Sequence, residues 1–322
     1  MLSLAIVVPC YNEQEAFSIC VEKLKFVLNK LKEKNKINNQ SYILFIDDGS
    51  KDDTWELIKS ASQHDAMVKG LKLSANRGHQ IALIAGLANT SADISISIDA
   101  DLQDDLNCIE KMIDKYNAGF EIIYGVRNDR SSDTNFKKKS ARLFYSLMNF
   151  FGVNQVPDHA DFRLMGRSSI NGLKQFKEQN IYLRGLIPLL GYKSTNVYYS
   201  REKRVAGKSK YPLKKMLALA LEGITSLSVT PLRIIALTGV VICFFSVFTA
   251  FYAFFEKING NAVAGWASVT IAISFLGGIQ MLSLGIIGEY IGKIYLESKN
   301  RPKFFIEEVT NNFLQSNEKV NG

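Results

Sequence analysis

ISISIDADLQDD, residues 94–105, joins a short apolar run to four aspartates. The apolar part is small and β-branched, which is typical of a buried strand. Side chains two residues apart in a strand point to the same side, so Asp99 and Asp101 are expected to present both carboxylates to one point past the strand end. Two converging carboxylates repel each other unless a cation lies between them, and Mg²⁺ or Mn²⁺ binds carboxylates together with phosphate oxygens and water. The alternative is a loop in which Asp104 or Asp105 caps the following helix.

Further β-branched runs alternate with amphipathic stretches on both sides of this segment. The expected strands are 4–9, 42–47, 68–73, 93–99 and 121–126, and the expected helices are 13–34, 52–63, 78–89 and 106–118. This alternation predicts an α/β fold with a mostly parallel sheet that helices cover on both faces. Ligands of such sheets lie beyond the carboxyl ends of the strands. Three of those ends carry polar motifs, PCYNE, DDGS and DADLQDD.

Two long segments without charge predict a pair of transmembrane helices. Ile234–Phe255 has 22 residues and Ala262–Gly288 has 27, and each can cross a hydrocarbon layer of ~30 Å. Lys and Arg flank the pair on the outer sides, whereas the turn EKINGN between them is nearly neutral. The positive-inside bias therefore puts both chain ends in the cytoplasm. A pair of buried soluble helices is the alternative, but too little chain follows to surround them.

These segments divide the 322-residue chain into four parts. We expect a cytoplasmic α/β domain over 1–211, an interfacial helix over 212–230, two membrane helices within 231–290 (about 234–255 and 263–288), and a cytoplasmic tail over 291–322. The region 126–211 is less regular, with a possible amphipathic helix over 136–151, and we expect the acceptor half of the site there. The tail after Ile306 is polar and expected to be loosely ordered.

Composition excludes several classes of protein. The four cysteines are far apart and form no CxxC pair, which argues against a zinc site and a disulfide framework. The opening MLSLAIVVPCYNE has no basic n-region, so no signal peptide is expected. A net charge of +8 suits a membrane surface, an anionic substrate or nucleic acid. Because the positive charge follows the apolar spans, a membrane and an anionic substrate are expected and nucleic acid is not.

The motifs as a set resemble a known family. VVPCYNE, DDGSKDDT, NRGHQIALIAGL and DADLQD follow the first four strands in the order that resembles the GT-A glycosyltransferases of family 2. DFRLM and REKRVAGKSKYPLKK, followed by two spans, are similar to the polyisoprenyl-phosphate branch, with its GtrB-type and dolichyl-phosphate mannose synthase-like enzymes. The resemblance covers residues 4–303. It implies a GT-A fold, a Rossmann-like mixed sheet, and inverting, metal-dependent transfer of a hexose, expected to be glucose, from a UDP-sugar to undecaprenyl phosphate in the bacterial cytoplasmic membrane.

The resemblance also implies roles for individual residues. The nucleotide sugar is expected to contact Pro9, Tyr11, Asn12, Glu13, Asp48, Arg77 and Asp99, and the metal Asp99 and Asp101. A tyrosine ring can stack on a base, and acids and amides can bond to ribose and uracil. Asp161 matches the position of a base or phosphate-orienting residue, and we favour orientation, with Asp104 as the rival base. His79 is not favoured as a base, because nothing near it in sequence forms a relay.

A lipid phosphate as acceptor changes what the enzyme must supply. Its second pKa is near ~6, so an ionised oxygen is available at neutral pH and no strong base is required. Cations should then neutralise it, and the candidates are Arg163, Arg184, Arg201, Arg204, Lys208 and Lys210. The basic loop over 201–210 can alternatively be a membrane anchor.

Other possibilities stay open at this point. The donor can be UDP-GlcNAc or GDP-mannose, the acceptor can be a glycan, or the chain can be a non-catalytic sensor of nucleotide sugars. Small residues in GWASVTIAISFLGG also leave room for a homo-oligomer, such as a tetramer, through the spans.

Overall fold

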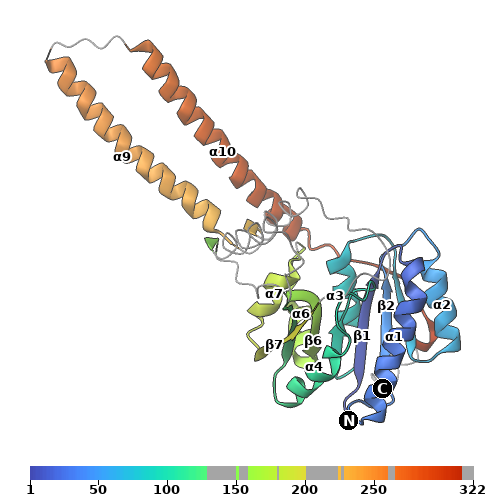
Figure 1. Ribbon diagram of the computed structural model, residues 1–322. Coiled ribbons are helices and arrows are strands. Elements are labelled where there is room, and N and C mark those ends of the chain that lie inside the picture. Colours follow the sequence, from blue (N-terminus) through green and yellow to red (C-terminus); the bar gives the residue numbers. More distant parts are fainter. Residues whose placement is uncertain are drawn as a thin grey trace.

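The computed structural model describes residues 1–128, 150–151, 159–179, 181–200, 224–225, 228–259 and 265–313. In this part of the chain, a long helical hairpin projects from an α/β domain (Figure 1). Several predicted features lie outside the described residues: Arg201, Arg204, Lys208, Lys210, most of the helix over 136–151 and nearly all of the interfacial helix over 212–230.

The domain is built on one mixed sheet. Its strands are β1 (Leu4–Cys10), β2 (Tyr42–Asp47), β3 (Val68–Leu73), β4 (Ile94–Ser97), β5 (Ile122–Arg127), β6 (His159–Gly166), β7 (Ser194–Tyr199) and β8 (Ile306–Val309). Their order in the sheet is β7-β5-β6-β4-β1-β2-β3-β8. Neighbouring strands are parallel except that β6 runs antiparallel to β4 and β5, and β8 runs antiparallel to β3. The five predicted strands are all present, and the structure adds β6, β7 and β8.

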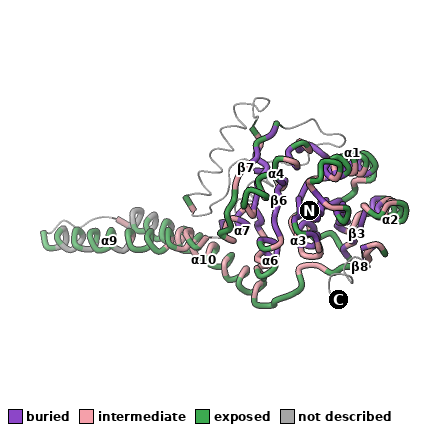
Figure 2. Tube along the Cα trace, turned by 90° about the horizontal axis from the view of Figure 1, so that it is seen from below, coloured by how far each residue is buried: buried purple, intermediate pink, exposed green. Residues whose placement is uncertain are grey.

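Helices cover both faces of the sheet, as the alternation predicts. On one face lie α1 (Gln14–Glu33), α2 (Thr54–His64) and α4 (Cys108–Asn117); on the other lie α3 (His79–Asn89), α6 (Arg167–Gln175) and α7 (Leu183–Leu189). Side chains of β1 alternate between the two layers: Leu4 and Ile6 pack under α1, whereas Ala5 and Val7 pack under α3. Figure 2 shows the resulting buried interior.

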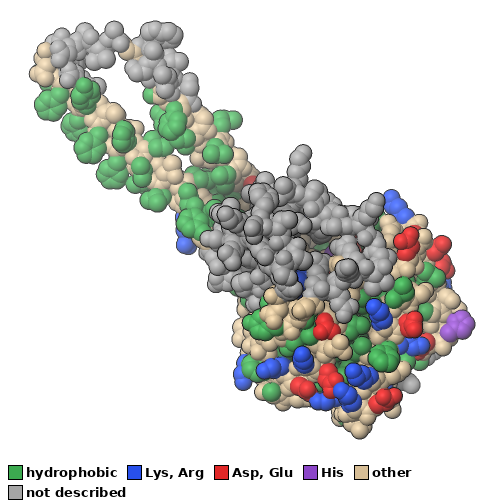
Figure 3. Space-filling model, in the orientation of Figure 1, with side chains coloured by type: hydrophobic (Ala, Val, Ile, Leu, Met, Phe, Trp, Pro, Cys, Tyr) green, Lys and Arg blue, Asp and Glu red, His purple; other side chains and the backbone are tan. Residues whose placement is uncertain are grey.

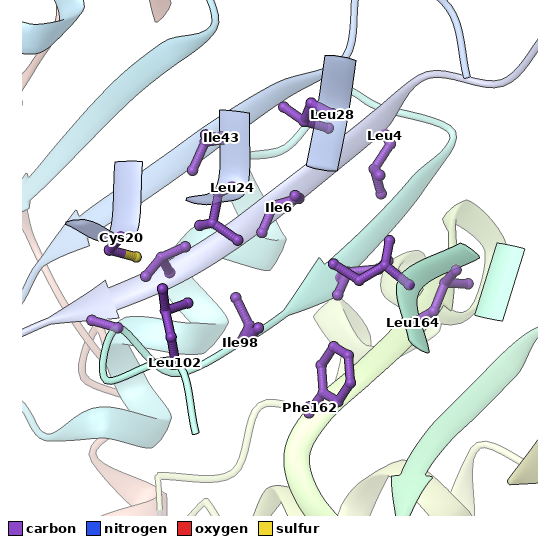
Figure 4. Close-up of a cluster of buried hydrophobic side chains, with 14 of the residues drawn as sticks. Leu4, Ile6, Cys20, Leu24, Leu28, Ile43, Ile98, Leu102, Phe162 and Leu164 are labelled. Atoms are coloured by element: carbon purple, nitrogen blue, oxygen red, sulfur yellow. The ribbon is translucent and has the colours of Figure 1, made fainter. Parts of the chain in front are cut away.

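The first helix illustrates how the sequence creates this packing. Cys20, Leu24 and Leu28 recur every four residues, so they form one apolar stripe that is fully buried. Figure 4 shows this stripe against Ile6 and Ile43 of the sheet. Each buried leucine contributes roughly 2 kcal/mol through removal of apolar surface from water.

Small residues set the position of α3. A Cβ at Gly86 would come within 2.4 Å of Val7 Cγ1, so this helix lies very close to β1. Ala82 and Ala85 on the same helix are completely buried. The close approach fixes the first residue of α3, His79, at the edge of the sheet where the polar motifs lie.

The hairpin consists of α9 (Thr230–Ile258) and α10 (Trp266–Ser298). With 29 and 33 residues they are about 44 and 50 Å long, more than a bilayer core requires. Large apolar side chains such as Phe244, Phe245 and Phe248 are exposed, and Figure 3 shows apolar side chains along the described hairpin. Soluble proteins rarely expose so much apolar surface, so the hairpin indicates association with a membrane.

After the hairpin, the chain returns to the sheet. Strand β8 pairs with the edge strand β3, and Glu308 accepts a hydrogen bond from Trp55 Nε1 at 2.9 Å. Thr310 Oγ1 accepts from the backbone N–H of Gly70 at 2.9 Å, and Phe313 is buried. The expectation of a loosely ordered tail after Ile306 is therefore wrong for residues 306–313. The sequence of this segment is polar because many side chains of an edge strand lie in water. The backbone of β8 nevertheless forms hydrogen bonds with the otherwise unpaired edge of β3.

Candidate active site

The topology of the sheet brings separate acidic segments to one edge. The carboxyl ends of β1, β2 and β4 meet there because these strands are parallel, and the amino end of β6 joins them because β6 is antiparallel. Ser97, which ends β4, pairs with Arg163, and its hydroxyl donates to the backbone oxygen of Asp161. The loop that carries Asp99 and Asp101 therefore comes close to Asp161. Strand β1 runs from the N-terminus toward the side of the domain nearer the hairpin (Figure 1).

Three charged side chains, those of Arg163, Arg184 and His79, converge at this edge on Asp161. Its Oδ1 lies 2.5 Å from Nη2 of Arg163, and its Oδ2 lies 3.3 Å from Nη2 of Arg184. Nε2 of His79 lies 3.4 Å from Asp161 Oδ2 and 3.5 Å from Asp99 Oδ1, so the imidazole bridges the two carboxylates. Strand β6 and helices α3 and α7 thus contribute to one charged cluster with the loop after β4.

The cluster fixes the protonation of Asp161 and His79. Burial alone would raise the pKa of Asp161, but Arg184, the hydrogen bond from His79 and Arg163 together hold it well below its usual range. Burial lowers the pKa of His79, but the hydrogen bond to Asp161 and the charges of Asp99 and Asp161 outweigh it and raise the pKa to about 9. At neutral pH the imidazole is therefore protonated and Asp161 is ionised, so His79 is poorly suited to accept a proton.

Asp99 is a buried carboxyl with three other acids nearby. Burial raises its pKa to about 6, with His79 opposing the shift and Asp161, Asp104 and Asp101 adding to it. Its Oδ1 accepts no hydrogen bond from any described residue, while Asp101 Oδ1 accepts from the backbone N–H of Gln103 at 3.3 Å. Within the described ranges, no three His, Cys, Asp or Glu side chains form a metal site on their own. A cation here would need further oxygen ligands from a substrate.

Asp104 serves a different purpose in the same loop. Its side chain is 2% exposed, and it accepts hydrogen bonds from the hydroxyl of Tyr199 and, at 3.3 Å, from Nη2 of Arg127. These contacts tie the loop to β5 and β7. The alternative that Asp104 or Asp105 caps the next helix is wrong, because the N-cap of α4 is Asn107 and no described side chain caps it; Asp105 Oδ1 instead accepts from the backbone N–H of Asn107 at 2.9 Å in the preceding turn.

The end of β2 is connected to the start of α3 through Asp48. Its two carboxylate oxygens accept the backbone N–H groups of Arg77 at 2.7 Å and of Gly78 at 2.8 Å, and burial raises the pKa of this carboxyl. Gly49 has a φ of 65°, and a Cβ there would lie 2.7 Å from Asn76 N. Only glycine fits this approach, so the DDGS turn and the NRGHQ loop are held as a unit.

The other predicted nucleotide contacts lie at the end of β1, namely Pro9, Tyr11, Asn12 and Glu13. Pro9 is buried within the strand, whereas the ring of Tyr11 is 41% exposed and available for stacking. Asn12 is held in a left-handed conformation with a φ of 54°, and its Oδ1 accepts from the backbone N–H of Lys51 at 2.9 Å. The PCYNE and DDGS loops thus form one continuous rim.

Sequence reasoning placed most of these groups near strand ends but missed several of their contacts. The role of His79 as a bridge, and the contacts that Arg127 and Tyr199 make with Asp104, could not be inferred, because no spacing in the chain relates them. Asp161 lies close enough to Asp99 for His79 to bridge them because of the antiparallel register of β6 beside β4. The only signal for it is DFRLM itself, which combines an acid and a base with apolar residues.

Comparison with known proteins gives two matches to family models. Residues 5–172 match "Glycosyl transferase family 2", and residues 230–294 match "GtrB C-terminal hairpin". The first range ends within α6, and the second spans α9 and most of α10.

Full-length relatives extend the similarity. The chain is 51% identical over 306 residues to "Uncharacterized glycosyltransferase YkoT" of Bacillus subtilis (strain 168), covering 94% of this chain and 91% of that protein. It is 39% identical over 310 residues to "Prophage bactoprenol glucosyl transferase homolog" of Escherichia coli (strain K12), covering 96% and 99%. A solved structure, glucosyl-3-phosphoglycerate synthase from Mycobacterium tuberculosis in complex with Mn²⁺, UDP-glucose and phosphoglyceric acid, is 17% identical, with a TM-score of 0.44 and coverage of 70% of this chain and 78% of that chain.

Proposed function

The chain belongs to the family 2 glycosyltransferases, and we propose that it transfers glucose from UDP-glucose to undecaprenyl phosphate or a similar polyprenyl phosphate. The observation that carries this proposal is the presence of the family 2 match and the GtrB hairpin match in one chain. Relatives named bactoprenol glucosyl transferases, at 38–39% identity over nearly the whole chain, support the sugar and the acceptor. Their names do not specify the donor nucleotide, so UDP rests on the family resemblance.

Asp99 and Asp101 are proposed to hold a divalent cation, Mg²⁺ or Mn²⁺, together with the diphosphate of the donor. The residues fit such an ion, because Asp99 Oδ1 accepts no hydrogen bond from a described residue, and burial together with the charges of neighbouring acids raises the pKa of its carboxyl. When bound, the ion would neutralise charge on the departing nucleoside diphosphate. Tyr11 and the rim formed by PCYNE and DDGS are proposed to hold the base and ribose.

Arg184 is proposed to meet the acceptor phosphate. Its side chain is 36% exposed, whereas Arg163 lies fully buried on the other side of Asp161. Asp161 can therefore orient the guanidinium of Arg184 toward the substrate, while the guanidinium of Arg163 compensates the negative charge of Asp161. This arrangement favours Asp161 as an orienting residue and leaves Asp104 with a structural role, because Asp104 is already bonded to Tyr199 and Arg127. The basic residues over 201–210 are proposed to add further phosphate contacts.

The hairpin is proposed to span the bacterial cytoplasmic membrane with both chain ends on the cytoplasmic side. Its flanking charges support this orientation, since Arg233 precedes the first apolar span and Lys299, Arg301 and Lys303 follow the second. In this orientation the acidic edge of the sheet faces the leaflet that contains the lipid acceptor. A homo-oligomer through α9 and α10 remains a prediction.

The proposal is tested by supplying detergent-purified protein with polyprenyl phosphate and a panel of labelled UDP-glucose, UDP-GlcNAc, UDP-galactose and GDP-mannose. We expect label to enter the organic phase from UDP-glucose at a rate at least tenfold above the other donors. A second sugar that transfers as fast would refute glucose specificity. Label that stays in an aqueous polymer would favour a glycan acceptor, and nucleotide-sugar binding without transfer of label would favour a sensor.

A further inference from the structure

A basic cavity lies between α3 and the segment that leads from α10 to β8. It has a volume of about 430 Å³ and is lined by Arg77, Arg301, Lys303 and Gln179, with Ile81 and Phe305 as apolar neighbours. Arg77 precedes the start of α3, and the other cations come from more than 200 residues later in the chain. The fold thus gathers three positive charges that the sequence keeps apart.

Two of these cations have no partner within the described part of the chain. Neither the guanidinium of Arg77 nor that of Arg301 forms a hydrogen bond or ion pair with a described residue. Lys303 donates to the backbone oxygen of Phe176 at 2.6 Å; burial lowers the pKa of its ammonium, although the nearby acids oppose this. The nearby acids Glu178 and Glu297 act on Lys303, whereas no described acid forms an ion pair with either arginine side chain. The two arginines of the cavity therefore remain available to bind an anion.

The position of the cavity identifies the kind of anion. Helix α10 ends at Ser298, three residues before Arg301, and its apolar span runs from Phe275 to Ser298. Where such a span ends, the chain is at the level of the lipid headgroups, whose phosphates attract Lys and Arg. Arg77 and Arg301 in the lining suit a phosphate group, because two guanidinium groups can bind it with several hydrogen bonds.

We propose that this cavity binds the headgroup phosphate of an anionic phospholipid, at a site separate from that of the acceptor. The cavity shares no lining residue with the cluster around Asp161. Arg77 nevertheless connects the two, because its backbone N–H is bonded to Asp48 and His79, two residues later, bridges Asp99 and Asp161. A bound phospholipid would hold the NRGHQ loop in place and increase the turnover of the enzyme in anionic membranes. Only this last consequence rests on the proposed function.

The direct test measures binding of short-chain phosphatidylglycerol to the full-length protein in detergent, with no sugar donor present. We expect Arg301→Gln to weaken binding by about tenfold, because it removes a charged multidentate contact. The matched control is Arg233→Gln, an exposed arginine in the first turn of α9 that lies outside the cavity and has no described partner. Its affinity should stay within about twofold of the wild type, and Arg301→Lys should retain most of the binding.

Several outcomes would overturn the proposal. Equal losses of phosphatidylglycerol affinity in Arg301→Gln and Arg233→Gln would indicate a general attraction of basic residues to the lipid. Unchanged affinity in Arg301→Gln would show that the cavity is not a binding site. Displacement by an equimolar short-chain isoprenyl phosphate would make this the acceptor site, and equal affinity for inorganic phosphate would exclude headgroup recognition. Because the assay needs no catalysis, its result is independent of whether glucose is the transferred sugar. In liposomes, added phosphatidylglycerol should accelerate the wild type at least threefold more than it accelerates Arg301→Gln.

Discussion

Removing the carboxylate of Asp161 should destabilise the domain as well as the reaction. In Asp161→Ala, Arg163 would keep a charge in a fully buried position, where its Nε and Nη1 have no hydrogen-bond acceptor among the described residues. The only described ion pair of this guanidinium, at 2.5 Å, would be lost. The substitution therefore isolates a buried charge, which is among the most costly changes in a protein interior.

The magnitude follows from the two arginines that Asp161 holds. Breaking a buried ion pair by removing one partner costs about 3–5 kcal/mol. The pair with Arg184 is 36% exposed on the arginine side and contributes less than about 1 kcal/mol. The sum of about 4 kcal/mol corresponds to a fall in Tm of roughly 8–16 °C for a domain of this size.

Thermal denaturation of the detergent-solubilised protein, followed by intrinsic fluorescence, measures this effect. The control is Asp101→Asn, which changes an acid in the same cluster without contact to Arg163 and should shift Tm by less than about 2 °C. The double variant Asp161→Ala/Arg163→Met should recover most of the loss, because it removes the buried charge. A Tm for Asp161→Ala within about 2 °C of the wild type, or a double variant no more stable than the single one, would show that Asp161 does not compensate a buried charge on Arg163.

Three further predictions concern other parts of the molecule. His79 has a folded pKa of about 9 against ~6.5 when unfolded, so its stabilisation is complete below pH ~6.5 and is lost as pH rises through 9. Because the imidazole is 38% exposed, solvent screening reduces the expected loss in the free energy of unfolding to about 1–2 kcal/mol. Urea unfolding at pH 6.5 and pH 9.5 should show this difference in the wild type but not in His79→Gln. Phe313→Ala should lower the free energy of unfolding by about 3 kcal/mol, because this buried ring anchors the segment after β8. The variant should be cleaved faster by a protease near the C-terminus. Cleavage at the wild-type rate would contradict this prediction. Tyr199→Phe should lower the free energy of unfolding by about 1–2 kcal/mol, because it removes a hydrogen bond to buried Asp104. The KM for the sugar donor should stay unchanged. A tenfold higher KM would instead give Asp104 a place in the donor site.

The central part of the fold could be predicted because its signals are local. Apolar runs such as Leu4–Cys10 and stripes such as Cys20, Leu24 and Leu28 specify buried strands and amphipathic helices on their own. The hairpin was predicted for the same reason, although α10 continues to Ser298, ten residues past the expected boundary at Gly288. The prediction rested on a run without charge, whereas the candidate membrane span Phe275–Ser298 also contains Glu289, Lys293 and Glu297.

The parts that escaped prediction depend on contacts between distant segments. Strand β8 is a short polar sequence, and only the open edge of β3 makes it a strand. Asp161 reaches Asp99 because β6 inserts antiparallel beside β4, a choice that the local sequence does not encode. His79 could be seen as a titratable residue but not as a bridge, since its two partners come from different elements. Chemistry that needs several elements is visible in sequence only as separate candidate residues.

The most direct test of the proposed reaction compares two acceptors that differ only in the phosphate. Purified protein with labelled UDP-glucose and a divalent cation is given either a polyprenyl phosphate or the matching polyprenol, and the label extracted into organic solvent is measured. We expect label in the lipid phase with the polyprenyl phosphate alone, and we expect this label to be lost in Asp99→Asn or on chelation of the metal. Transfer to the polyprenol at a comparable rate, or no transfer to the phosphate, would contradict the claim that an ionised lipid phosphate is the nucleophile.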